Sequence, residues 1–333
     1  CLNAVFVAAE FSLVKLRFTR FETAEMERAR RAARLARLRD SEFIYEFTRS
    51  PLALLSAAIF AIICLAALLA PLIAPMDPFD PANANIVDAR LPPLSEGLFG
   101  NYYLLGSDPQ GRDIFSTILF GARTSLLVGL ASVLFAGVIG VVLGLLAGYA
   151  GGFIDTLIMR AADVQLSFPA ILIALLIDGI ARNVISREQH ESLAVLVLVF
   201  AIGISNWVQY ARTVRSVALV ERSREYVQAA AVTGVHPLRI IFRHILPNVL
   251  GPVLVIATIN LALAIITEST LSFLGVGVPP TQPSLGTLVR IGNEFLFSGS
   301  WWISIFPGMT LVVLSLSVNL LGDWLRDALN PKL

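Results

Sequence analysis

The sequence predicts an all-α membrane protein with six transmembrane helices. Of its 333 residues, 56% are hydrophobic and only 15% are charged, whereas soluble domains carry about 25% charged residues. A helix needs about 20 mostly apolar residues to cross the hydrocarbon core of a bilayer. Six runs meet that requirement: residues 52–75, 117–148, 155–180, 192–213, 249–275 and 302–322.

The distribution of arginine predicts the orientation of these spans. Segment 28–49 contains seven arginines and segment 212–247 contains six, whereas the alternate loops contain few basic residues. Basic residues concentrate on the cytoplasmic side of membrane proteins. Both termini and segment 214–247 should therefore be cytoplasmic. The loops 76–116, 181–191 and 276–301 should face the other side.

These boundaries divide the chain into four parts. Residues 1–49 form a cytoplasmic N-terminal segment, in which the origin of residues 1–22 stays open. Residues 50–76 contain the first transmembrane helix, and 77–116 form an extracytoplasmic loop. Residues 117–333 form a core of five transmembrane helices.

Small and ionisable residues inside the spans indicate how the helices pack. Gly140, Gly144 and Gly148 recur every four positions and form a groove on one helix face. In lipid, such a groove allows close backbone approach. Packing within one bundle is the favoured interpretation, and a contact between subunits is the alternative.

Charged groups at membrane depth should face protein or water. For Asp163 we favour a structural role. For Glu268 a structural hydrogen-bonding role and a role in lining a polar path are equally supported. Pro169 should kink the third span, because it frees a backbone carbonyl.

Residues 224–246 lie between the fourth and fifth runs, and we call them the connecting segment. Their sequence pattern predicts a helix, a turn and a second helix. Ser223 is placed to cap the first helix, and Gly234 stands where a left-handed residue is required. Pro237 suits the first turn of the second helix, and Pro247 should end it. The second helix should present one apolar stripe, formed by Leu238, Ile241, Phe242 and Ile245.

Two interpretations of the connecting segment follow from its residues. It either joins two spans at the membrane surface or binds a partner protein in the cytoplasm. The chain has no Gly-x-x-x-x-Gly-Lys-Ser/Thr phosphate-binding loop and no spacing typical of metal ligands. We therefore expect no catalytic residues, no metal site and no ATPase activity in this chain.

Three ordered motifs resemble one family of membrane proteins. The connecting segment contains Gln228-Ala229-Ala230, then Gly234, then the stretch 244–247, His-Ile-Leu-Pro. This pattern resembles the coupling motif of ABC-importer permeases, although Gln228 replaces a glutamate and His244 an isoleucine. Residues 105–113 and 268–277 resemble further segments of the dipeptide, oligopeptide and nickel permease branch.

The resemblance implies a type I ABC importer permease fold with a cytoplasmic coupling helix at residues 224–246. One first span followed by five core spans resembles the C-type permease of a pair. The implied partners are a sister permease, two ABC ATPase subunits, an extracytoplasmic substrate-binding protein and membrane lipid, with no nucleic acid. The chain would bind no cofactor, because ATP and magnesium belong to the ATPase subunits. The implied location is the bacterial cytoplasmic membrane.

The resemblance also assigns residues. The residues expected to couple the chain to the ATPases are Arg224, Glu225, Tyr226, Gln228, Ala229, Ala230, Gly234, Pro237, Arg243 and Pro247. Asn260, Thr267 and Glu268 are candidates for the translocation path. The implied function is import of peptides or peptide-like solutes driven by ATP. The alternative is a stand-alone carrier or channel driven by an ion gradient.

Overall fold

The computed structural model describes residues 42–80, 85–98, 100–279 and 282–329. The chain divides into two compact units, residues 1–54 and 55–333. Within the first unit, α2 (Glu42–Arg49) is described. Residues 1–22, whose origin the sequence left open, lie outside the described residues.

Long apolar helices make up most of the second unit. Five helices in the described part are long and apolar enough to cross a membrane. They are α3 (Pro51–Leu68), α5 (Ile114–Ala150), α8 (Arg187–Arg222), α11 (Leu246–Phe273) and α13 (Trp302–Ala328). A short helix, α4 (Ala70–Ile73), follows α3.

The predicted third span is divided into α6 (Gly152–Leu166) and α7 (Ala170–Val184), which meet at a bend of 92°. If this pair is one span, the described residues contain up to six. The predicted kink at Pro169 is a full break between two helices. Proline disfavours helix in the residue before it, so the chain breaks there. Gln165 joins the end of α6 to α8. Its side chain accepts a hydrogen bond of 2.6 Å from the indole of Trp207 and donates one to the carbonyl of Ile204.

The glycine groove packs against α8 of the same chain. A Cβ at Gly144 would lie 2.6 Å from the carbonyl oxygen of Ala211, and one at Gly140 would lie 2.6 Å from that of Trp207. At Gly148 it would lie 2.7 Å from Cβ of Ala218. The favoured interpretation, packing within one bundle, is therefore confirmed.

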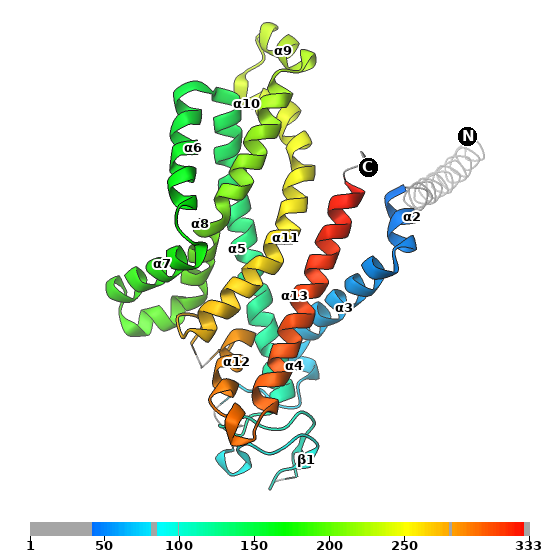
Figure 1. The fold of residues 1–333 in the computed structure, drawn as a ribbon, viewed down its shortest axis with the longest axis vertical. Helices are drawn as coiled ribbons and strands as arrows, with labels where there is room; N and C mark the ends of the chain where they lie inside the picture. Colours follow the sequence, from blue (N-terminus) through cyan, green and yellow to red (C-terminus); the bar gives the residue numbers. More distant parts are fainter. Residues whose placement is uncertain (1–41, 81–84, 99, 280–281, 330–333) are drawn as a thin grey trace, which may run out of the picture. The chain divides into compact units, whose positions relative to one another are not determined.

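The two ends of the second unit differ in character. Figure 1 shows α9 at one end, and α12 and β1 at the other. The end with α12 (Leu285–Asn293) also contains η2 (Ile86–Asp88), η4 (Leu296–Ser298) and a hairpin of β1 (Ser95–Glu96) and β2 (Tyr102–Tyr103).

Residues 105–113 form hydrogen bonds and an ion pair that stabilise this end of the unit. Arg112 and Asp108 form a buried ion pair, in which Nε lies 2.7 Å from the carboxylate. Asp108 also accepts hydrogen bonds from the backbone N–H groups of Gln110 and Arg112. The carbonyl of Ser107 accepts one of 3.3 Å from the indole of Trp302. The motif therefore joins the loop to the start of α13.

Candidate functional site

The connecting segment begins where α8 ends. Its first helix is α9 (Glu225–Val232), and its N-cap residue is Arg224, without a side-chain capping hydrogen bond. The expected cap by Ser223 was wrong. The hydroxyl of Ser223 instead donates to the carbonyl of Val220, 2.7 Å away, because Ser223 closes the last turn of α8.

Gly234 ends α9 in the left-handed conformation, with φ of +80°. Its N–H donates to Ala231, and the N–H of Val235 donates to Ala230, both at 3.1 Å. These two backbone hydrogen bonds together form a Schellman motif, which satisfies carbonyl groups left free at a helix end. The prediction for Gly234 is confirmed. A helix end closed in this way holds α9 at a defined angle to the residues that follow.

Helix α10 (Pro237–Ile240) begins with proline in its first turn, as predicted, and is capped by the side chain of His236. It continues into a π-helical turn, η3 (Ile241–Ile245), and then directly into α11. The expectation that Pro247 ends the helix was wrong. The N–H of Leu246 bonds to the carbonyl of Ile241, five residues back. A wider turn of this kind accommodates a proline that cannot join the regular ladder.

The buried face of the second helix differs from the predicted apolar stripe. Leu238 and Phe242 are 55% and 64% exposed, although the predicted stripe includes both. Ile240, by contrast, is buried with Ile241 and Ile245 in one hydrophobic cluster. Half of the predicted stripe therefore lies on the surface.

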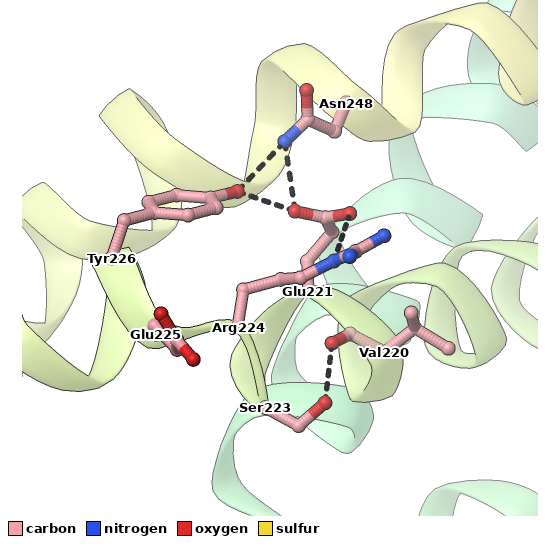
Figure 2. A pocket seen from close by; sticks show the side chains of 7 residues that line it. All are labelled: Val220, Glu221, Ser223, Arg224, Glu225, Tyr226 and Asn248. Atoms are coloured by element: carbon pink, nitrogen blue, oxygen red, sulfur yellow. Dashed lines mark hydrogen bonds and ion pairs between the residues drawn. The ribbon is translucent and has the colours of Figure 1, made fainter.

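Three polar side chains connect α8, α9 and α11. Figure 2 shows Glu221, Tyr226 and Asn248 converging on one point. The Tyr226 hydroxyl donates to Glu221, and the Asn248 amide lies 2.9 Å from Glu221 and 3.0 Å from Tyr226. Arg224 adds an ion pair with Glu221 at 3.7 Å. The hydrogen bond to Glu221 raises the pKa of Tyr226, because it stabilises the protonated hydroxyl.

This network lies in an open surface pocket of about 900 Å³. The lining residues are Val220, Glu221, Ser223, Arg224, Glu225, Tyr226 and Asn248. Glu221 and Asn248 are absent from the residues assigned by sequence. They lie 27 positions apart, and no spacing signal brings them together. The pocket therefore combines predicted residues of α9 with residues from the ends of two transmembrane helices.

The predicted coupling residues are mostly accessible on one segment. Ala230 is half-buried, and the other nine are exposed: Arg224, Glu225, Tyr226, Gln228, Ala229, Gly234, Pro237, Arg243 and Pro247. Val232, 88% exposed, adds an apolar side chain to this surface. The segment thus combines a fixed backbone with an accessible mixed surface, which suits binding of another protein.

The predicted path residues lie elsewhere. Glu268 and Asn260 are 0% and 2% exposed, and Thr267 is half-buried. Their assignment to the path stays a prediction. Within the described residues, no group of three or more His, Cys, Asp or Glu side chains could hold a metal ion.

Comparison with known proteins adds independent information. A family model described as "Binding-protein-dependent transport system inner membrane component" matches residues 140–333. A second model, the N-terminal transmembrane domain of oligopeptide transport permease C, matches residues 41–93. Together these matches include the first span and most of the core.

Individual relatives agree with the family models. A dipeptide transport system permease protein of Haemophilus influenzae is 40% identical over 88% of this chain and 94% of its own length. An oligopeptide transport system permease protein of Bacillus subtilis is 33% identical over 86% and 88%. An inward-facing structure of the MetNI methionine ABC transporter has a similar fold, with a TM-score of 0.50 and 20% identity. It covers 65% of this chain and 98% of the matched chain.

Proposed function

Because this chain belongs to the family of inner membrane components of binding-protein-dependent transport systems, we propose that it is the C-type permease of an ATP-driven peptide importer. The relatives named for dipeptide and oligopeptide transport support peptides as the substrate class. A permease that functions with other ABC components does not need an ion gradient. The relatives therefore favour this function over a stand-alone carrier or channel.

The observation that carries the proposal is that the connecting segment is exposed at the surface while its backbone is held in a fixed conformation. Its Schellman motif and its hydrogen bonds to α8 and α11 hold it against the transmembrane helices. A segment held in this way can transmit a rigid-body displacement from a bound partner. We assign the partner as one of two ATPase subunits, which would bind ATP and magnesium. A sister permease and an extracytoplasmic binding protein complete the assembly.

This assignment also sets the orientation. The connecting segment and both termini would be cytoplasmic, since the arginine-rich segments lie there. The end that contains β1, β2 and α12 would face the binding protein. Asn260, Thr267 and Glu268 remain candidates for the path, which would require rearrangement around the two buried residues in another conformation.

A glycine substitution tests the proposal. Gly234 and Gly299 both have positive φ, +80° and +90°, and no atom within 4 Å of an added Cβ. Valine at either position is therefore strained to a similar degree without an internal clash. Gly299 directly follows η4, which contacts α12, and α12 lies at the opposite end of the unit from α9. Gly299→Val is thus the matched control for Gly234→Val.

The readouts are retention of the ATPase subunits on the affinity-tagged chain and ATP-driven peptide uptake. Gly234→Val should lower both, and Gly234→Asn should lower them less, because asparagine tolerates the left-handed region. Gly299→Val should leave retention unchanged. Normal retention and uptake in Gly234→Val would contradict the proposed coupling role.

A further inference from the structure

Helix α6 exposes two faces of opposite character. One stripe is apolar, and its members Phe153, Leu157 and Val164 are 79%, 59% and 62% exposed. Beside it runs an exposed polar stripe at helical spacing: Thr156, Arg160, Asp163 and Ser167. A surface helix with two such faces lies at a boundary between an apolar and an aqueous or polar environment.

Helix α8 continues the polar stripe of α6. Gln209, Arg212 and Ser216 are exposed at spacings of three and four residues. Arg212 and Asp163 form an ion pair of 2.6 Å between the two helices, with side chains 48% and 51% exposed. We call Thr156, Arg160, Asp163, Gln209, Arg212 and Ser216 the α6–α8 polar face. Figure 1 shows the two helices side by side.

The polar face extends inward from the end that carries the connecting segment. Arg212 lies ten residues before the end of α8 at Arg222, which corresponds to about 15 Å along the helix. A second ion pair, between Arg215 and Asp155, joins α6 and α8 nearer that end and is less exposed. The two pairs fix α6 against α8, while the pair further from that end, Asp163–Arg212, keeps about half of its side-chain surface exposed.

Three environments could cover this face. Lipid is unfavourable, because charged side chains avoid hydrocarbon and turn toward protein or water. A dry contact with another subunit would bury both members of the Asp163–Arg212 pair, and desolvation can cost more than their attraction returns. Water leaves the pair hydrated. The adjoining apolar stripe, with Leu157 at its centre, then faces lipid or a subunit.

We propose that the α6–α8 polar face is a water-exposed wall of the translocation path on its cytoplasmic side. This inference rests on the proposed function, because it assumes a path through which a peptide passes. A peptide with free termini carries an ammonium and a carboxylate. Asp163 and Arg212 offer each of them an opposite charge, and a hydrated ion pair exchanges partners at low cost.

Cysteine accessibility tests the inference in the complete transporter, in inside-out membrane vesicles. The native Cys1 and Cys64 are first replaced by serine. Single cysteines are then placed on the polar face, as Gln209→Cys and Thr156→Cys. Leu157→Cys, on the apolar stripe of the same helix, is the matched control. The probe is a membrane-impermeant maleimide, which reacts with the thiolate.

The expected result is rapid labelling at the two polar positions. An apolar environment raises the pKa of a thiol, and an increase of one pKa unit reduces the thiolate fraction about tenfold. Leu157→Cys should therefore be labelled at least about tenfold more slowly than the two polar positions. Trapping the transporter with ATP and vanadate should slow labelling of Gln209→Cys and Thr156→Cys, because the path then closes on the cytoplasmic side. Two positions on different helices keep the test decisive if one variant does not assemble.

Two results would overturn the inference. Labelling of both polar positions as slowly as Leu157→Cys would show a dry face. Rapid labelling that trapping leaves unchanged would show a permanently open surface rather than a path. Failure of the proposed function is distinguishable from either result, since ATP-driven peptide uptake itself would then be absent.

Discussion

Ser125 of α5 donates a hydrogen bond of 2.9 Å to the carboxyl group of Glu268 in α11, although the residues are 143 positions apart. Ser272 donates a second, of 2.7 Å, and Ser269 a third, of 3.3 Å. The Ser125 oxygen also accepts one of 3.2 Å from the backbone N–H of Leu285, at the start of α12. A fully buried carboxyl group thus joins three helices through hydroxyl groups.

The first prediction concerns this group. Ser125→Ala removes the hydrogen bond to Glu268 and the one from Leu285. Leaving these buried groups without their partner should lower the free energy of unfolding by about 1–3 kcal/mol. The thermal stability of this variant in detergent should therefore fall. Glu268→Gln keeps an acceptor and should be milder than Glu268→Ala. Ser132→Ala is the control, because the Ser132 hydroxyl on the same helix is buried without a hydrogen-bond partner in the described structure. Equal effects of Ser125→Ala and Ser132→Ala would contradict this account.

The second prediction concerns the contact between α5 and α8. Gly144→Ala would place a methyl group 2.6 Å from the carbonyl oxygen of Ala211, so the helices must separate. Overpacking of this kind costs about 1–3 kcal/mol. Gly137→Ala, whose Cβ would lie 3.8 Å from the Tyr210 ring, should be neutral or slightly stabilising, because alanine favours helix. Thermal unfolding of the two variants in detergent makes the comparison, and a stable Gly144→Ala protein would refute it.

The third prediction concerns the start of α5. Asp113 caps the helix and accepts a hydrogen bond of 2.7 Å from the N–H of Ser116. Burial raises the pKa of Asp113 above its ordinary value. Its raised pKa favours the protonated form on folding, so the carboxyl contributes most to stability at low pH, and that contribution falls as pH rises through the folded pKa.

Asparagine keeps the capping acceptor and carries no charge. Asp113→Asn should therefore be at least as stable as the parent at pH 7 and vary less with pH, whereas Asp113→Ala should lose about 0.5–2 kcal/mol. The measurement is the thermal midpoint of each of the three proteins from about pH 4, near the ordinary pKa of an aspartate, up to about pH 8. A loss in Asp113→Asn as large as that in Asp113→Ala would show that the charge, rather than the acceptor, stabilises the cap.

Much of this architecture was predictable, because it depends on composition and on local signals. Long apolar runs predict the spans, and Gly234 and Pro237 have local conformational requirements that no tertiary contact alters. The glycine groove likewise needs only its spacing to predict a close helix contact.

The remaining features depend on contacts distant in sequence. The apolar spacing predicts neither the π turn before Pro247 nor the burial of Ile240 in place of Leu238. The sequence predicts neither the 92° bend at Pro169 nor the hydrogen bond between Gln165 and Trp207, which are 42 positions apart. Glu221 and Asn248 meet only after α8 and α11 have packed.

The fourth prediction tests the Tyr226 network itself. Tyr226→Phe keeps the ring but removes the hydroxyl that donates to Glu221 and accepts from Asn248. Each such bond contributes about 0.5–1.5 kcal/mol, so the fold should survive. The connecting segment should nevertheless be held less firmly to α8 and α11. If the segment transmits displacement, peptide-stimulated ATP hydrolysis should fall more than retention of the ATPase subunits does. Asn248→Ala should show the same separation, because it removes the amide that contacts both other residues.

Tyr45→Phe is the control, since Tyr45 is 54% exposed in α2, outside the connecting segment and outside the end assigned to the binding protein. It should leave retention and hydrolysis at parental values. Parallel loss of retention and stimulation in Tyr226→Phe would assign the hydroxyl to binding of the partner rather than to holding the segment. Unchanged values in both Tyr226→Phe and Asn248→Ala would mean that the Schellman motif and the π turn alone fix the segment, because those backbone features remain intact in both variants.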